Sequence, residues 1–123
     1  MKFNIDHVNI NVTDIERSVE FYKKALGLEL VRRHDAEDGS FALAFVGGGA
    51  GGINIELTWL RDKDGPYELG DNETHIAFRA ADYDAAHTLH AEMGAICFEN
   101  AAMGLYFIED PDGYWIEIFP EKR

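Results

Sequence analysis

Four side chains of this 123-residue chain have the chemistry to bind a divalent metal ion and stand on predicted strands: His7, Glu56, His75 and Glu117. Glu117 lies in the run 114–119, where alternation puts it on the same strand face as Trp115 and Phe119. Burying a carboxylate without a partner costs more free energy than a strand gains from packing. We therefore expect Glu117 to have a metal ion, a cation or a proton as its partner.

The first half of the chain predicts one strand, one helix and three further strands. Residues 7–12 alternate between polar and apolar side chains, which indicates a strand with His7 on its polar face. A capping box at Thr13 to Glu16 predicts the start of a helix, and Gly27 predicts its end. The remaining predicted strands of this half are 28–33, 41–46 and 53–59.

The second half repeats this order after a charged connection at 61–72. Residues 75–80 predict a strand, and 83–93 predict a helix that Gly94 ends. The segment DPDG at 110–113 predicts a turn, because proline presets φ and glycine tolerates the tight backbone conformation at the end of such a turn. Further strands are predicted at 95–99, 105–109 and 114–119. The pattern indicates an α+β fold of two βαβββ repeats, about 3–60 and 72–120, in one domain spanning 1–123.

The repeat aligns His7 with His75, and Glu56 with Glu117. If the two halves pack as related sheets, these four side chains converge on one concavity. Imidazole nitrogen and carboxylate oxygen suit first-row divalent ions, and two of each leave coordination positions for water or substrate oxygens. The sequence thus predicts a catalytic rather than a closed structural metal site.

Taken singly, the histidines and glutamates have simpler explanations. His7 and Glu56 could each be an ordinary polar residue of a strand. His87 and His90, three apart on the second predicted helix, could chelate a metal, although such a pair more often forms a solvated face. His34 has no matched partner. The metal prediction therefore depends on the matched positions in the repeat.

Composition narrows the possible partners. The chain has 11 basic and 23 acidic residues, and its net charge of −12 disfavours nucleic acid and anionic membrane surfaces. It has no apolar run near ~20 residues, no signal sequence and a lone cysteine, Cys97, so we expect a cytoplasmic protein. The glycine-rich segment 47–52 lacks the lysine and the Ser or Thr of a phosphate loop and predicts a hairpin.

Short phrases along nearly the whole chain carry a family resemblance: ERS at 16–18, FY at 21–22, LG at 26–27, LAFVG at 43–47, IELT at 55–58, YELG at 67–70, HIA at 75–77 and EDPDGY at 109–114. With the order His, Glu, His, Glu, they resemble the vicinal oxygen chelate superfamily, which has the glyoxalase/bleomycin resistance-like fold, and within it bacterial glyoxalase I. Ring-cleaving and fosfomycin-modifying relatives generally use two histidines and one carboxylate. The second carboxylate, Glu56, therefore favours a resemblance to glyoxalase I, which isomerises its substrate.

The resemblance implies a metal-dependent lyase that converts the hemithioacetal of methylglyoxal and a thiol into a lactoyl thioester through an enediolate. It implies one divalent ion per site, with nickel or cobalt favoured and zinc, manganese or iron possible. Glu117 would be the main catalytic base, and Glu56 its partner. It also implies a homodimer with sites at the interface, where one chain supplies His7 and Glu56 and the other supplies His75 and Glu117.

Three features depart from the family's pattern for binding glutathione. Asn11 and Leu60 stand where the family commonly has an arginine and an asparagine, and the segment 96–106 contains no lysine or arginine. The thiol could therefore be glutathione or a substitute. Two alternatives stay open: another metal-dependent enzyme of the superfamily with a different small substrate, or a small-molecule-binding protein of the same fold.

Arg79 offers a candidate replacement for the missing arginine. It lies four residues after His75, so both side chains are expected on one strand face. Alternatively, Arg79 pairs with nearby Asp82 at the end of the strand. The candidate substrate contacts are Arg79, Asn11, Leu60 and Trp115.

Overall fold

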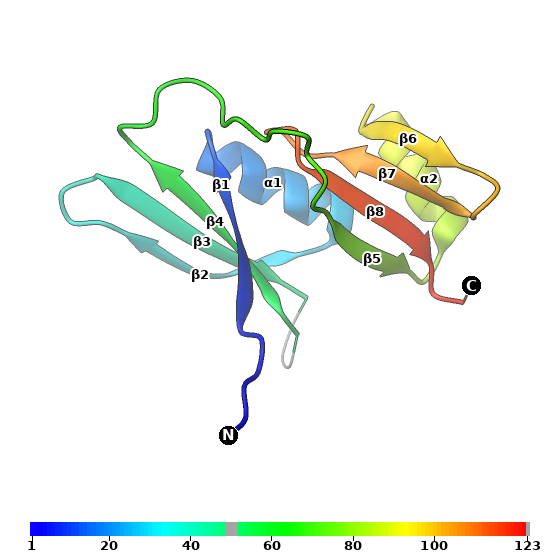
Figure 1. The fold of residues 1–123 in the computed structure, drawn as a ribbon, viewed down its shortest axis with the longest axis horizontal. Coiled ribbons are helices and arrows are strands. Elements are labelled where there is room, and N and C mark those ends of the chain that lie inside the picture. The colour runs from blue at the N-terminus through cyan, green and yellow to red at the C-terminus, as the bar shows by residue number, and fades with distance from the viewer. Residues whose placement is uncertain (49–51, 123) are drawn as a thin grey trace. The chain divides into compact units, whose positions relative to one another are not determined.

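The computed structural model describes residues 1–48 and 52–122. It contains two compact units, Met1–Tyr67 and Glu68–Arg123, each built on one four-stranded sheet (Figure 1). The α+β fold of two related halves is thereby confirmed. The single domain and the pairing of halves in a dimer stay predictions.

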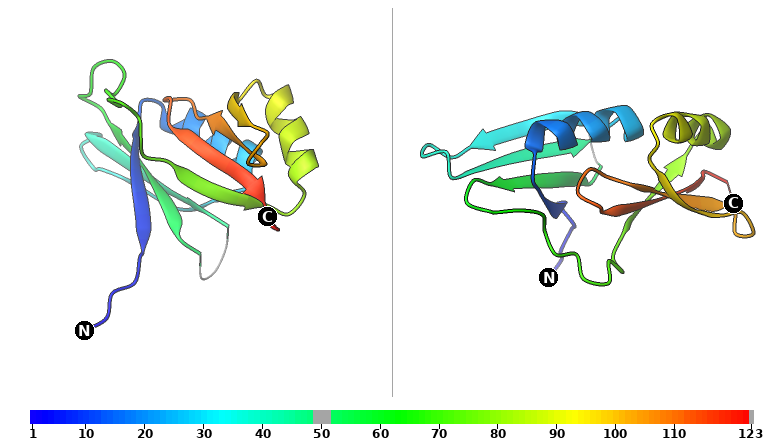
Figure 2. Two further views of the ribbon diagram at one scale, coloured as in Figure 1. Left: turned by 45° about the vertical axis from the view of Figure 1, so that its right-hand side comes forward. Right: turned by 90° about the horizontal axis from the view of Figure 1, so that it is seen from above.

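The first unit contains five elements in chain order: β1 (His7–Val12), α1 (Ile15–Leu26), β2 (Glu29–Asp35), β3 (Phe41–Gly47) and β4 (Asn54–Leu60). Its strands lie in the order β1-β4-β3-β2, in which β1 and β4 are parallel and the other neighbours antiparallel. Figure 2 shows α1 along one face of this sheet. The opposite face carries His7 and Glu56.

The start of α1 differs by one residue from the prediction. Asp14, rather than Thr13, is the N-cap, and its Oδ1 accepts a hydrogen bond of 3.0 Å from the amide of Arg17. An aspartate carboxylate also suits the positive end of the helix dipole, which favours this choice of cap. Gly27 ends the helix as predicted, with φ of +68°, a left-handed conformation that glycine adopts without strain.

The second unit repeats the order of the first: β5 (Ile76–Ala80), α2 (Tyr83–Glu92), β6 (Ile96–Asn100), β7 (Leu105–Glu109) and β8 (Trp115–Pro120). Its strand order is β5-β8-β7-β6, and β5 and β8 are parallel. Both units therefore have the same topology, which confirms the predicted βαβββ repeat. The predicted strand limits agree with the observed limits to within two residues.

The turn before β8 is held by a buried carboxylate. Asp110 is only 4% exposed, and its Oδ1 accepts hydrogen bonds of 2.9 Å from the amides of Asp112 and Tyr114. Gly113 has φ of +93°, which an L side chain rarely adopts. The predicted turn is confirmed, and it fixes where β8 begins and therefore where Glu117 lies.

His90 belongs to the core of the second unit and not to a metal-binding or solvated face, so both predictions for the pair His87 and His90 are wrong for His90. It is 1% exposed, and its Nδ1 lies 2.7 Å from the hydroxyl oxygen of Tyr106. Burial raises the pKa of Tyr106, so the hydroxyl stays protonated and can donate. His87 is partly exposed, and its Nε2 lies 2.5 Å from Glu99 Oε1.

We expect Tyr106→Phe to lower the free energy of unfolding by about 1–3 kcal/mol, because His90 loses a hydrogen-bond partner in a site that water does not reach. Urea denaturation at neutral pH measures the change. Tyr83→Phe is the matched control, since the Tyr83 ring also packs against Tyr106, with centroids 5.5 Å apart. The control is expected to change stability by less than about 0.5 kcal/mol. Equal stability of both variants would contradict the structural role of the His90 bond.

Other sequence predictions have simpler outcomes. Cys97 lies half-buried in β6, and burial raises the pKa of its thiol. The predicted hairpin at 47–52 includes residues 49–51, which lie outside the described residues. Among the helices of the described chain, α1 and α2, neither has the length and apolar character needed to span a membrane.

Candidate metal centre

In the first unit, parallel pairing of β1 and β4 brings His7 to Glu56. His7 Nε2 lies 3.5 Å from Glu56 Oε1, and His7 Nδ1 lies 2.8 Å from Asp6 Oδ2. When Nδ1–H donates to Asp6, the neutral ring presents a lone pair at Nε2 toward the glutamate oxygen. Two electron-pair donors that face each other in this way suit a cation placed between them.

The second unit forms the same pair from its equivalent strands. His75 stands directly before β5, and its Nε2 lies 3.0 Å from Oε1 of Glu117 in β8. Both separations are shorter than twice the ~2.1 Å distance of a typical metal–nitrogen or metal–oxygen bond, so one ion could contact both members of a pair. The glutamates are well shielded, with side chains 16% and 14% exposed for Glu56 and Glu117.

The structure thus assembles the four predicted ligands as two pairs. Across residues 1–48 and 52–122 no three His, Cys, Asp or Glu side chains form a group that could hold a metal ion. The union of both pairs around one ion stays a prediction. The donor types fit such an ion, because two imidazoles and two carboxylates are suitable ligands for first-row divalent metals.

A phenylalanine packs on each pair, and sequence reasoning missed both. The His7 and Phe45 rings meet edge to face at 5.5 Å and 88°, and the His75 and Phe107 rings do so at 5.1 Å and 85°. Phe45 pairs across the sheet with Glu56, as Phe107 pairs with Glu117. Each unit therefore contains a His–Glu–Phe triad. The signal available in the sequence was that Phe45 and Phe107 occupy corresponding strands of the repeat.

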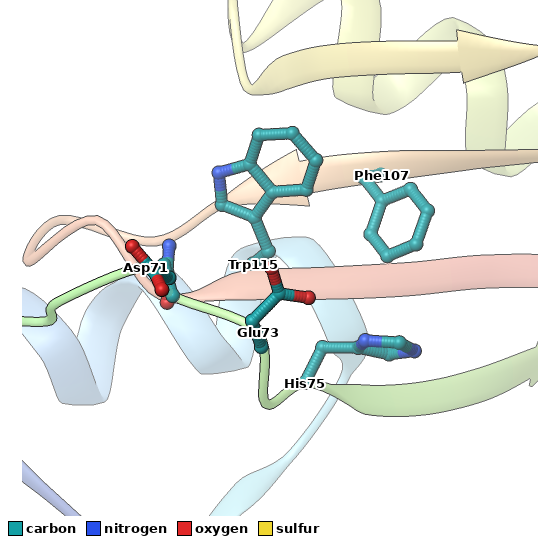
Figure 3. A pocket seen from close by; sticks show the side chains of 6 residues that line it. Asp71, Glu73, His75, Phe107 and Trp115 are labelled. Carbon is teal, nitrogen blue, oxygen red and sulfur yellow. The ribbon is translucent and has the colours of Figure 1, made fainter.

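A pocket opens beside the second triad, with a volume of about 440 Å³. Figure 3 shows Trp115 and Phe107 next to His75 and the segment 71–73. Asn72 fixes this segment, because its Nδ2 donates a 3.0 Å hydrogen bond to the carbonyl oxygen of Gly113. Trp115 lines the pocket, while its contact with a substrate stays a prediction.

The other candidate substrate residues lie on the two sheets. Asn11 is half-buried in β1, and its Nδ2 donates a 3.4 Å hydrogen bond to the Tyr67 hydroxyl. Leu60 ends β4 and is 39% exposed. Arg79 lies in β5, and its Cζ is 5.0 Å from the centroid of the Phe119 ring.

Arg32 is a further residue that sequence reasoning missed. Its Cζ lies 4.3 Å from the centroid of the Phe45 ring, on the sheet face that carries Glu56. The neighbouring Arg33 behaves differently, because ion pairs with Asp35 at 3.0 Å and Glu16 at 2.7 Å raise its pKa. Strand alternation separates the two arginines onto opposite faces, but it could not identify the ring beneath Arg32.

Comparisons with known proteins identify the family of the chain. Residues 4–118 match the model of the Glyoxalase/Bleomycin resistance protein/Dioxygenase superfamily. The chain is 37% identical over 124 residues to a lactoylglutathione lyase of Neisseria meningitidis, covering 94% of this chain and 89% of that protein. It is 39% identical over 122 residues to a probable lactoylglutathione lyase of Synechocystis, covering 91% of both.

A solved structure is also similar over nearly the full length. The trypanothione-dependent glyoxalase I of Leishmania major superimposes with a TM-score of 0.88 and 29% sequence identity, covering 98% of this chain and 88% of that one. The repeated topology, the two triads and these matches together show that the chain belongs to the Glyoxalase/Bleomycin resistance protein/Dioxygenase superfamily.

Proposed function

We propose that this chain is a glyoxalase I-type carbon–sulfur lyase, which converts the hemithioacetal of methylglyoxal and a thiol into the lactoyl thioester. The observation that carries the proposal is the pairing of His7 with Glu56 and of His75 with Glu117 at equivalent places in the two units. The relatives named lactoylglutathione lyase or probable lactoylglutathione lyase support the same activity, because they are 37% and 39% identical to this chain over the aligned residues.

The four ligand residues would hold one divalent ion, for which nickel or cobalt is our first choice. When bound, such an ion polarises substrate oxygens and acidifies the adjacent C–H bond. The two phenylalanines would shield the pairs from water, since each lies against a histidine ring and across from a glutamate. We place the activity in the cytoplasm, where the lone Cys97 suits a reducing compartment.

The carboxylates of Glu117 and Glu56 would transfer the proton. Glu117 would remove the proton from the carbon that bears sulfur and return it to the neighbouring carbon, while the hydroxyl proton on the first carbon passes to the oxygen on the second, so that no atom is gained or lost overall. Glu56 and Glu117 are about equally shielded, but Glu117 lies across from Phe107 and two residues after Trp115, and both of these residues line the pocket. Glu56 would be its partner in proton transfer on the opposite side of the substrate.

The test is an isomerase assay on metal-depleted protein reconstituted with Ni, Co, Zn, Mn or Fe. Methylglyoxal is premixed with glutathione, cysteamine or 2-mercaptoethanol, and formation of the thioester is followed by its ultraviolet absorbance. We expect turnover that depends on added metal with at least one thiol. Absence of thioester with every metal and every thiol would reject the proposed reaction.

We further propose that each complete site draws one pair from each subunit of a homodimer. Mixing His7→Ala protein with His75→Ala protein should then restore about one quarter of the sites, because half of the dimers are mixed and each has one intact site. Activity is measured before and after subunit exchange, and exchange itself is followed by native mass spectrometry. Persistent inactivity despite proven exchange would favour sites formed within one chain.

A further inference from the structure

Arg79 is a positively charged residue on a strand of the acidic second unit. The second unit, Glu68–Arg123, has three lysine or arginine residues, Arg79, Lys122 and Arg123, and the last two end the sequence, whereas carboxylates are frequent throughout the unit. Arg79 is also exposed in β5 and is the cation nearest in sequence to the His75 ligand. A lone guanidinium on a strand of such an acidic unit calls for an explanation.

The strand register places Arg79 on the face that carries the triad. Ala77 pairs with Glu117, and Arg79 pairs with Phe119, so Arg79 lies two residues beyond Glu117 along the same face. Two residues of strand span about 7 Å. The guanidinium lies over the Phe119 ring, with Cζ 5.0 Å from the centroid, and this contact holds the side chain against the sheet.

Arg79 has no carboxylate partner in the described chain. The ion pairs among residues 1–48 and 52–122 do not include Arg79. Asp82, the alternative partner considered from the sequence, instead caps α2, where its Oδ1 accepts a 3.0 Å hydrogen bond from the amide of Ala85. The expected pair of Arg79 with Asp82 is therefore absent, and the guanidinium edge keeps its donors available.

A guanidinium that stacks on an aromatic ring is suited to bind an oxyanion. The ring meets the guanidinium through its π face, and the N–H groups form a planar fork that matches a carboxylate or a phosphate. Such charge-assisted pairs are shorter and stronger than neutral hydrogen bonds. The ring also restricts the side chain before a ligand arrives, which lowers the entropic cost of binding.

We propose that Arg79 binds an oxyanion, a carboxylate or a phosphate, on the thiol part of the substrate. This inference rests on the proposed function and names the substrate class that the site selects. Four residues of strand between His75 and Arg79 span about 13 Å, so the anion is several bonds away from the reacting carbons. Methylglyoxal is too small to reach that far, and the anion therefore belongs to the thiol.

The experiment uses pairs of thiols that differ chiefly in an oxyanion, which the member called charged carries and the member called uncharged lacks. Hemithioacetals of methylglyoxal are prepared with glutathione and its diethyl ester, and with 4′-phosphopantetheine and pantetheine. Arg79→Ala should raise KM for the charged member of one pair by about 10- to 100-fold and leave the uncharged member nearly unchanged. Arg79→Lys should recover part of the loss, because it restores the charge but not the fork.

Two further variants make the result specific. Lys122→Ala removes the same charge from the same unit and should leave both members of each pair unchanged. Arg32→Ala removes the other guanidinium that stacks on a phenylalanine. Equal changes for charged and uncharged thiols in Arg79→Ala, or a charge-specific loss that appears in Arg32→Ala and not in Arg79→Ala, would overturn the proposal.

A binding measurement separates this inference from the reaction itself. Calorimetric titration with S-methylglutathione, S-methylphosphopantetheine and their uncharged counterparts needs no turnover. If wild-type protein forms no thioester, yet Arg79→Ala weakens binding of a charged thioether alone, the proposed reaction fails while the role of Arg79 stands. If thioester forms but no charged thioether depends on Arg79, the proposed reaction stands and the role of Arg79 fails.

Discussion

Replacing Glu117 by glutamine is expected to lower turnover of the hemithioacetal by about 100-fold or more while metal binding is largely retained. The amide has the shape of the carboxylate and can still offer an oxygen to a metal, but it cannot accept a proton from carbon. Turnover is measured under saturating substrate, and the metal content of the same sample is determined by mass spectrometry. The result isolates proton transfer from ligand loss.

Two variants control this result. Glu92→Gln removes an exposed carboxylate from the end of α2 and should leave turnover unchanged. Glu56→Gln tests the other carboxylate, and the larger loss is expected for Glu117 because that residue is taken to be the main base. A Glu117→Gln protein with full metal content and nearly normal turnover would end this assignment.

The sequence alone was sufficient for the topology because local signals agree with the repeat. Alternation in β1, the glycine after α1 and the proline-containing turn before β8 each fix one boundary, and the repeat supplies the rest. The position of His7 and Glu56 on polar strand faces also follows from alternation. Sequence reasoning could therefore predict which face of its strand each of these residues occupies, and in which half.

Contacts between neighbouring strands could not be predicted in the same way. Alternation places Phe45 and Phe107 on a face, but only the register shows that each lies across from a glutamate and against a histidine. The prediction for His90 was wrong for a related reason. Spacing on a helix gives the direction of a side chain, while its partner, the Tyr106 hydroxyl, comes from a strand 16 residues later.

Competition for one side chain explains the outcome for Asp82. Proximity in sequence suggested that it pairs with Arg79, whereas the structure uses it to cap α2. The first amide groups of a helix have no acceptor within the helix. An aspartate at the N-cap accepts a hydrogen bond from one of these amides and needs no distant partner to do so. This local demand leaves Arg79 on the aromatic ring of Phe119.

The second large effect is expected on metal binding. Wild-type protein should bind one divalent ion per set of His7, Glu56, His75 and Glu117, and His75→Ala should lose stoichiometric binding. Removal of a group that only orients a ligand already weakens metal binding by about 10- to 100-fold, so removal of a ligand itself should cost at least as much. Metal content is measured after reconstitution with Ni, Co, Zn, Mn and Fe followed by exhaustive dialysis.

His87→Ala is the matched control for His75→Ala. Both histidines belong to the second unit, both side chains are 38% exposed, and both lie within 3.0 Å of a glutamate oxygen. His87 has no counterpart in the repeat, and so its loss should leave the metal content unchanged. If His75→Ala retains metal as the wild type does, His75 and Glu117 form only an ion pair on the sheet. The proposed lyase would then lack the metal ion that acidifies its substrate.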